Sequence, residues 1–231
     1  MFMKEKMNNI NWNFKNKIVV IVGASRGIGK STADHFENAG ATVYRVSTAN
    51  CDISKKLDID NYIKKLTRID ILVNAAAINY TKKIDEISFD EWDEVININL
   101  RGIFYFIKKS LKIMPNGSKI VNVSSIAGHR KSLVSGVHYV SSKAGLIGLT
   151  KQLSSELGCR NININAVCPS QTLTDMLRNS MTDQELKDLC QSIPLNRIAT
   201  VEEQVYPIMF LSSNEASYLT GAVIQVNGGQ L

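Results

Sequence analysis

The sequence lacks the features that would place a protein in a membrane, outside the cell or in several domains. It has four cysteines and four prolines among 231 residues, with no CxxC pair and no proline-rich linker. The cysteines therefore favour a reduced compartment over a disulfide framework. No apolar run approaches the ~20 residues that span a bilayer, and residues 1–16 contain no apolar signal-peptide core. These absences predict a soluble cytoplasmic protein with no membrane partner.

Positive charge is in excess but is not gathered into one tract. The 27 Lys and Arg residues exceed the 21 Asp and Glu residues, which gives a net charge of +6 and a pI near 9.1. Lysine pairs such as Lys64–Lys65 and Lys82–Lys83 are scattered, as is typical of solvated helix faces. This pattern argues against nucleic-acid binding. No clustered His, Cys and Asp set indicates a metal.

Short apolar runs alternate with helical patterns along the chain. The β-branched runs predict strands buried on both faces, at 17–23, 41–46, 70–75, 119–124, 162–167 and 222–227. Helical patterns lie between them, at 28–39, 56–66, 90–113, 137–158 and 201–212. This alternation predicts an α/β fold with a doubly wound parallel sheet. Residues 17–231 are expected to form one domain, preceded by a short leader over 1–16.

A glycine-rich turn directly follows the first predicted strand. Gly23, Gly27 and Gly29 form G-x-x-x-G-x-G, and a helical pattern begins within it. Glycines let a pyrophosphate approach the backbone, and the helix start offers free N–H groups and a positive dipole end. In this position the turn indicates a dinucleotide site. The residues expected to line it are Gly23, Ser25, Arg26, Gly27, Ile28 and Gly29.

The segment HYVSSK places Tyr139 and Lys143 four residues apart, on one face of a predicted helix. Such a pair occurs by chance in many helices, so its meaning depends on the other motifs. A lysine charge beside a tyrosine favours the phenolate and would lower the tyrosine pKa from ~10. A tyrosine tuned in this way suits general acid–base catalysis.

Together with the glycine turn, this pair resembles the short-chain dehydrogenase/reductase family, from about Lys17 to the C-terminus. Further segments are similar to the family's motifs, in the family's order: DILVNAAA (70–77), INLRG (98–102), IVNVSSIAG (120–128), NAVCPSQTLTDM (165–176), IPLNRIATVEEQV (193–205) and SYLTGAVIQVNGG (217–229). The last two resemble its ketoreductase-like branch. The resemblance implies a Rossmann-type fold and an NAD(P)-dependent oxidoreductase that reduces a carbonyl or oxidises the matching secondary alcohol.

The resemblance also implies a role for each matching residue. Tyr139 would be the general acid, or the base in the oxidative direction, and Lys143 would tune it and bind the nicotinamide ribose. Ser125 would hydrogen-bond the substrate oxygen, and Asn99 would hold a water of the proton relay. Ser125 and Tyr139 stand fourteen residues apart, one more than is usual in the family, so we expect a longer substrate-pocket loop over 128–138.

Other cofactor contacts follow from the same resemblance. They are expected at Asn74, Ala75, Ala76, Pro169, Thr172 and Thr174, besides Tyr139 and Lys143. The segment at about 175–200 corresponds to the family's mobile lid over the substrate. The apolar helices at 90–113 and 137–158 correspond to the family's main subunit interface, which implies a homotetramer or homodimer.

The stretch RVSTANCDIS, residues 45–54, is the main departure from the family. Only a few residues separate the second predicted strand from Asp52, where the family inserts a helix and a full third strand. We therefore expect a shortened third strand, no intervening helix, and an open adenine end beside Asp52 and Ile53. Less buried surface predicts weaker cofactor binding than in full-length relatives.

The same stretch bears on the choice of cofactor. NAD-preferring enzymes place a carboxylate at the end of the second strand, and that position falls on Ser47 here. A serine does not repel a 2′-phosphate, and Arg26 in the glycine turn is placed to bind one, with Arg45 as a further helper. NADP(H) is therefore favoured over NAD(H).

Two alternatives to an NADPH-dependent carbonyl reductase stay open. An NAD-dependent alcohol or diol dehydrogenase would be expected to carry an acidic residue at Ser47. A cofactor-binding regulator without turnover would not need the complete set of Asn99, Ser125, Tyr139 and Lys143. The natural small-molecule substrate is not encoded in a readable way, because lid and pocket loops determine it.

Overall fold

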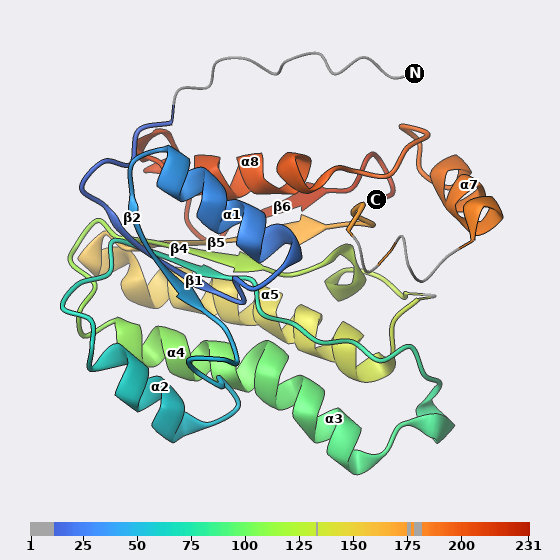
Figure 1. The fold of residues 1–231 in the computed structure, drawn as a ribbon, viewed down its shortest axis with the longest axis horizontal. Coiled ribbons are helices and arrows are strands. Elements are labelled where there is room, and N and C mark those ends of the chain that lie inside the picture. The colour runs from blue at the N-terminus through green and yellow to red at the C-terminus, as the bar shows by residue number, and fades with distance from the viewer. Residues whose placement is uncertain (1–11, 133, 175–176, 178–181) are drawn as a thin grey trace.

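Six parallel strands form one sheet in the order β2-β1-β3-β4-β5-β6 (Figure 1). The structure is a computed structural model that describes residues 12–132, 134–174, 177 and 182–231. The strands are β1 Ile18–Val22, β2 Thr42–Val46, β3 Ile71–Asn74, β4 Lys119–Val123, β5 Asn163–Pro169 and β6 Val223–Val226. The six strands predicted from the apolar runs are all present, so the doubly wound parallel sheet is confirmed.

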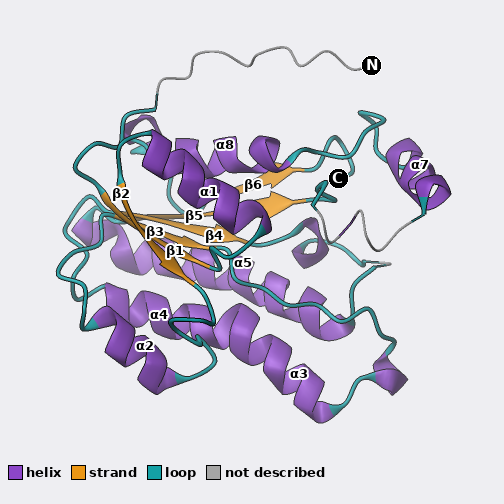
Figure 2. Cartoon of the chain, in the orientation of Figure 1, coloured by secondary structure: helices purple, strands orange, loops and turns teal. Residues whose placement is uncertain are grey.

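Helices cover both faces of the sheet (Figure 2). The helices α1 (Gly27–Asn38) and α8 (Val201–Leu211) pack on one face with Val19 and Ile21, whereas Val20 and Val22 point to the other. That second face is covered by α2 (Lys56–Ile63), α4 (Ile103–Ser110) and α5 (Val137–Leu157). Because both faces of each central strand are buried, the strand sequences are continuously apolar rather than alternating.

The remaining helical elements are short or lie at the margin. The helix α3 (Phe89–Ile96) continues into α4 through a π-helical segment, Asn97–Gly102, so the helix predicted at 90–113 is interrupted by one wide turn. The helix α7 (Asp183–Gln191) stands apart from the sheet (Figure 1). Single 3-10 turns lie at Ile84–Glu86, Ile126–Gly128, Gly158–Arg160 and Asn214–Ala216. No helix within the described ranges is both long and apolar enough to cross a bilayer.

The ordered domain begins before Lys17. Phe14 is buried, its ring centre lies 4.8 Å from that of Phe36 on α1, and Trp12 stacks on its other side. The leader expected over 1–16 therefore packs on the core from Trp12 onward, and residues 1–11 lie outside the described residues.

The chain between β2 and α2 forms no strand, so the expected shortened third strand is wrong. Residues 47–55 turn directly into α2, and β2 is left as the edge of the sheet. A further parallel strand would need a crossover of about a dozen residues or more, which this short stretch does not provide. Cys51 and Ile53 are buried instead and pack in the core beneath α2. The expected absence of an intervening helix is confirmed.

Candidate active site

Three of the predicted catalytic residues meet at the carboxyl ends of β4 and β5. Ser125 follows β4, and Tyr139 and Lys143 come from the first two turns of α5. The Lys143 Nζ lies 5.6 Å from the centre of the Tyr139 ring. Burial raises the pKa of Tyr139, and a hydrogen bond between the side chains of Ser125 and Tyr139 offsets part of that rise. Two hydroxyls and an amine are thus gathered at the carboxyl ends of the strands, where ligands of open α/β folds bind.

The two serines after β4 have different partners. Ser124 is buried, and its Oγ donates a hydrogen bond to the Lys143 carbonyl at 2.9 Å. The Ser125 Oγ accepts from the N–H of Ala127 at 3.1 Å and stays half-buried beside Tyr139. Ser125 is therefore the serine that a substrate oxygen at Tyr139 would meet.

Burial governs the protonation of this group. Lys143 is 1% exposed, and burial lowers its pKa from 10.5 to about 8. Its Nζ donates to the Val123 carbonyl at 2.8 Å. Burial raises the pKa of Tyr139, and the Ser125 bond offsets only part of that rise. Because its pKa is raised, Tyr139 keeps its proton at neutral pH in the protein alone, and the lowering of that pKa by Lys143 stays a prediction.

Asn99 lies in the π-helical segment and is fully buried. Its Oδ1 accepts from the N–H of Ile78 at 2.9 Å, and its Nδ2 donates to the Ile78 carbonyl at 2.9 Å and to the Ser142 Oγ at 3.1 Å. These bonds tie the loop after β3 to α5. The side chain therefore bonds Ser142, the residue before Lys143, and its hydrogen bonds to described residues do not include Lys143 itself.

Two glycines of the glycine turn are packed too tightly to carry a side chain, and the third is less crowded. A Cβ on Gly23 (φ +88°) would stand 2.5 Å from the Ala76 nitrogen, and one on Gly29 would stand 2.1 Å from the Gly23 carbonyl oxygen. At Gly27 (φ +56°), the nearest described atom to such a Cβ is the Thr174 Cγ2, at 3.8 Å. A Cβ on Gly27 would thus be in ordinary van der Waals contact with Thr174, without the clashes that one would meet at Gly23 or Gly29.

The start of α1 carries no cap of its own. Its N-cap residue, Arg26, is extended and makes no side-chain cap bond, and the first turn holds no acidic residue. In contrast, α3, α7 and α8 each begin with a capping box, from Ser88, Thr182 and Thr200. Free N–H groups and an uncompensated dipole favour an anion at α1. The residues present therefore fit a dinucleotide pyrophosphate.

The end of β2 lies against this turn. The Val46 carbonyl accepts from the N–H groups of Gly23 and Ala24 at 2.9 and 3.0 Å. Ser47 thus follows directly beside the turn that carries Arg26. The Arg26 side chain is exposed and pairs with no acid in the described part of the chain. Its charge is available to a ligand.

Arg45, predicted as a second phosphate ligand, is engaged elsewhere. Its guanidinium bonds Asp34 at 2.6 Å and both carboxylate oxygens of Glu37 at 3.1 and 2.8 Å. These bonds raise the pKa of Arg45, the Glu37 bond most. These partners argue against the helper role, because α1 lies over β2 and supplies the arginine with acids of its own.

The expected adenine contacts lie in a hydrogen-bonded turn. The Asp52 Oδ1 accepts from the N–H and Oγ of Ser54 at 3.0 and 2.7 Å, and Lys55 lies 3.2 Å from Oδ2. Burial acts to raise the pKa of Asp52, but these bonds outweigh it and lower that pKa. The carboxylate is thus ionised and can still accept a hydrogen bond. Ile53 is buried under it.

The remaining predicted contacts divide between structural and open positions. The Asn74 Nδ2 donates to the Asn122 Oδ1 at 2.8 Å, so its side chain ties β3 to β4. Ala75 and Ala76 pack against the glycine turn. Pro169 ends β5, the Thr172 Oγ1 donates to the Ser170 carbonyl at 3.0 Å, and Thr174 stays half-buried opposite Gly27.

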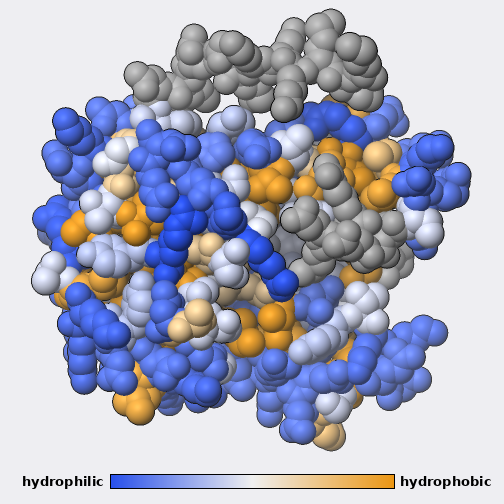
Figure 3. All heavy atoms as spheres, viewed as in Figure 1, coloured by the Kyte–Doolittle hydropathy of each residue, from blue (hydrophilic) through white to orange (hydrophobic). Residues whose placement is uncertain are grey.

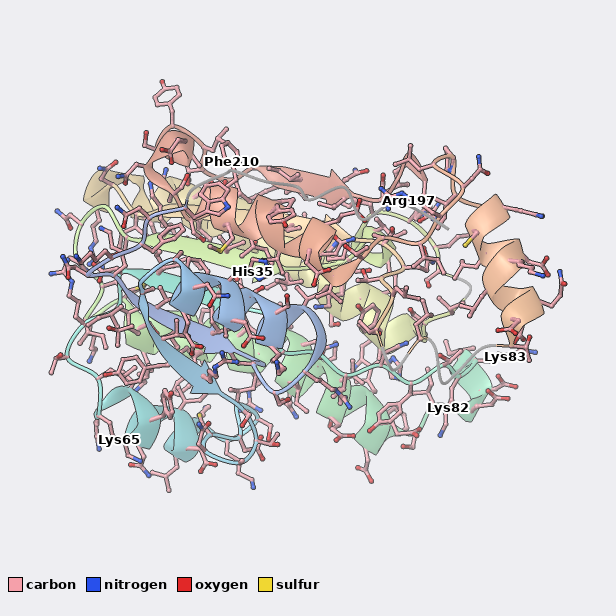
Figure 4. The ribbon with its side chains drawn as sticks, turned by 45° about the horizontal axis from the view of Figure 1, so that its top comes forward. His35, Lys65, Lys82, Lys83, Arg197 and Phe210 are labelled. Carbon is pink, nitrogen blue, oxygen red and sulfur yellow. The ribbon has the colours of Figure 1, made fainter. Side chains whose placement is uncertain are left out.

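The lid region is only partly described. Residues 175–176 and 178–181 of the expected lid lie outside the described residues, and α7 has no fully buried side chain. Lys82, Lys83 and Arg197 lie at the end of the molecule that carries α7 (Figure 4). In the space-filling view, hydrophilic side chains cover α7, and apolar side chains gather between α7 and α8 (Figure 3).

Sequence reasoning missed Cys168 as a neighbour of the site. It is fully buried next to Pro169, and its Sγ lies 3.5 Å from the Nε2 of His129. Burial raises the pKa of its thiol, and Ser124 and Lys143 offset part of that rise. The only signal was its position before the proline of the β5 motif. Within the described residues, no group of three or more His, Cys, Asp or Glu side chains could hold a metal ion.

Comparisons with known proteins agree with this geometry. A family model described as enoyl-(acyl carrier protein) reductase matches residues 23–230. The 3-oxoacyl-[acyl-carrier-protein] reductase of Aquifex aeolicus is 36% identical over 93% of this chain and 97% of its own. The ligand-free Thermoplasma acidophilum aldohexose dehydrogenase has a TM-score of 0.86 at 30% identity over 94% of both chains. The NADP-bound angucycline C-6 ketoreductase LanV has a TM-score of 0.86 at 27% identity, over 95% and 97% of the two chains.

Proposed function

The chain belongs to the short-chain dehydrogenase/reductase family, and we propose that it uses NADPH to reduce a ketone to a secondary alcohol. As a member it is an oxidoreductase that acts on C=O and CH–OH groups. The observation that carries the proposal is the meeting of Ser125, Tyr139 and Lys143 beside an α1 that begins without a cap.

Each residue has a role that its surroundings support. A bound nicotinamide supplies the hydride for the carbonyl carbon. Tyr139, whose pKa is raised by burial, holds the proton that the carbonyl oxygen needs. The Ser125 hydroxyl donates a hydrogen bond to that oxygen and stabilises the developing charge. Lys143, held by Val123, binds the ribose hydroxyls and returns a proton toward Tyr139. Asn99 fixes the loop and helix around it, and we assign it to the proton relay.

NADPH is the proposed cofactor because no negative charge lies at the end of β2 and the positive charge of Arg26 lies in the glycine turn beside it. Ser47 brings no carboxylate against a 2′-phosphate, and Arg26 beside it is unpaired among the described residues. The NADP-bound relative LanV supports the same choice. Asp52 and Ile53 would meet the adenine, and Pro169, Thr172 and Thr174 the nicotinamide end.

We propose a 3-oxoacyl thioester as the substrate class to test first. The curated relative from Aquifex aeolicus is named for this reaction. Exposed Arg130 and Lys131 follow Ser125 on the pocket loop and would suit a phosphate-bearing thioester carrier. We also expect a homotetramer or homodimer formed through α4 and α5, where Phe104 on α4 is 41% exposed.

The test is a turnover assay with a 3-oxoacyl coenzyme A thioester, following nicotinamide absorbance with NADPH and with NADH. We expect oxidation of NADPH that depends on the thioester, and little with NADH. The purified protein should also bind NADPH more tightly than NADH in calorimetry. Absence of binding and of turnover with both nucleotides would overturn the proposal.

A second candidate is oxidation of a sugar or another secondary alcohol with NAD. The likeness to the aldohexose dehydrogenase favours it. The same protein incubated with NAD and an aldohexose would then form NADH faster than NADPH is consumed with the thioester. Ser47 argues against this reading, because no carboxylate is offered to the ribose hydroxyls of NAD.

A further inference from the structure

The outer edge of β2 is the place where this sheet ends. Thr42 donates its N–H to the Lys17 carbonyl of the neighbouring chain segment at 2.9 Å. The backbone N–H and C=O groups of successive residues in a strand point to alternate sides. The odd-numbered residues of β2 therefore point these groups away from β1. The carbonyl of Arg45 and the N–H of Ser47 therefore point to the side where the family places a third strand.

One side chain pairs with both of these outward groups. The Oδ1 of Asn50 accepts from the Ser47 N–H at 2.9 Å, and its Nδ2 donates to the Arg45 carbonyl at 2.8 Å. A residue of a neighbouring parallel strand would bond the same two groups, one on each side of the residue opposite it. The carboxamide of Asn50 thus stands in for one residue of the missing strand.

The backbone around Asn50 completes the turn. The N–H groups of Asn50 and Cys51 both donate to the Ser47 carbonyl, at 3.0 and 2.8 Å, and Cys51 is buried. With its N–H held by Asn50, Ser47 has both backbone groups engaged. The hydroxyls of Ser47 and Thr48 make no hydrogen bond to any other described residue, and Thr48 is exposed.

This turn lies next to the glycine turn that carries Arg26. The Val46 carbonyl holds the glycine turn by two hydrogen bonds, so Ser47 is fixed against the segment that carries Arg26. Two free hydroxyls beside an unpaired guanidinium form a suitable set of donors for a phosphate. On the basis of the proposed function, we infer that Asn50 is a positioning residue that holds Ser47 and Thr48 to bind the 2′-phosphate of NADPH.

The inference predicts a loss of selectivity rather than of general binding. NADH has a single 2′-hydroxyl where NADPH has the 2′-phosphate, so it gains little from a fixed Ser47–Thr48 turn. Removing two hydrogen bonds in Asn50→Ala should weaken NADPH binding about tenfold, with NADH changed by less than about threefold. Asn50→Asp keeps the acceptor for Ser47, loses the donor to Arg45 and adds a negative charge, so it should weaken NADPH more than Asn50→Ala does.

The experiment is a calorimetric titration of the whole protein and these variants with NADPH and with NADH. Asn214→Ala is the matched control, because Asn214 is exposed at the far end of α8 and its side chain makes no hydrogen bond to a described residue. It should leave both affinities unchanged. Equal weakening of the two nucleotides by Asn50→Ala, or no weakening, would overturn the inference.

Hydrogen exchange gives a readout that needs no cofactor. The Ser47 amide should exchange slowly in the unmodified protein and at least tenfold faster in Asn50→Ala, with the β1 amides unchanged. Slow exchange in the variant would show that Asn50 does not hold the turn. The unmodified protein tests the proposed function separately: a protein that binds neither nucleotide overturns both proposals, whereas NADPH preference kept in Asn50→Ala overturns only this one.

Discussion

The two ends of the proposed cofactor crevice differ in how deeply the protein buries them. The catalytic end, Ser125 with Tyr139 and Lys143, lies between β4, β5 and α5, and Lys143 is 1% exposed. The adenosine end, Arg26 with the turn 47–52, lies at an edge strand, and Arg26 and Thr48 are exposed. The departures from the family pattern thus fall mainly on one end.

The difference shows which part of the chemistry needs burial. Burial sets the pKa of Lys143 to about 8 and raises that of Tyr139, and an open site would not do so. Phosphate binding needs only backbone N–H groups, hydroxyls and a positive charge, which a sheet edge can present to solvent. We therefore expect the absence of a strand at this edge to reduce cofactor affinity and to leave the proposed proton donor in place.

The largest effect should come from the catalytic end. Tyr139→Phe removes the proposed proton donor, so turnover should fall about 10³-fold. Binding of NADPH should change by less than about threefold, since the phosphates bind at the other end. Steady-state assays and calorimetry on the same preparation measure both quantities. Tyr218→Phe is the control, because Tyr218 is fully exposed, and both quantities should stay unchanged. Retained turnover in Tyr139→Phe would remove the tyrosine from the mechanism.

The adenosine end should instead control which nucleotide binds. Arg26→Glu replaces a charge-assisted hydrogen bond to the 2′-phosphate by repulsion, so NADPH affinity should fall by about 30-fold or more. NADH affinity should change little. Titration of the variant with both nucleotides measures the ratio. If NADPH is still preferred, its 2′-phosphate binds elsewhere, and the turn that carries Arg26 does not determine which nucleotide binds.

A substitution at the catalytic end should increase the free energy of unfolding even though it removes a proposed catalytic residue. Lys143→Met removes a buried amine whose pKa is lowered from 10.5 to about 8. The unfolded chain binds more protons than the folded one between these values, so the penalty is full below about pH 8 and disappears above about 10.5. The variant should gain on the order of 2 kcal/mol at pH 7, after loss of the Val123 bond, and less at pH 10.

Urea unfolding at pH 7 and pH 10 measures this difference. Lys151→Met, on the exposed face of α5, is the control and should show no such pH dependence. A Lys143→Met protein less stable than the unmodified one at pH 7 would mean that the lysine is a net stabilising group.

The smallest effect should come from Arg45. Arg45→Ala removes an ion pair network that is partly exposed, so the free energy of unfolding should fall by less than about 1 kcal/mol. The preference between NADPH and NADH should not change, because Asp34 and Glu37 already hold this arginine. Thermal unfolding and the two titrations are sufficient. A clear loss of NADPH preference would return Arg45 to the phosphate site.

The sequence predicted what depends on local pattern. Runs such as Val19–Val22 are apolar at every position because both faces are buried, and Tyr139 and Lys143 share a face because they lie one helical turn apart. It did not predict the partners of Arg45, which depend on α1 lying over β2. Nor did it predict the raised pKa of Tyr139, which reflects burial of the side chain in the folded protein.

The prediction of a shortened third strand was wrong for a different reason. Residues 47–55 carry no apolar run, but the family pattern suggested a remnant of the strand. Instead, the side chain of Asn50 hydrogen-bonds the outward backbone groups of Arg45 and Ser47 at the edge of the sheet. Sequence periodicity does not reveal such a side chain–backbone hydrogen bond. Turns closed by side chains in this way are visible only when the donors and acceptors are placed in space.

The uncapped start of α1 has a consequence for how long the protein survives. A helix with unsatisfied N–H groups gains more from an anion than one that carries its own capping box. Nucleotide at 100 times its dissociation constant would add about 2.7 kcal/mol to the folded state by mass action. Proteolytic half-life and cellular abundance would then rise with the nucleotide pool, so the amount of enzyme would follow the supply of its own reductant.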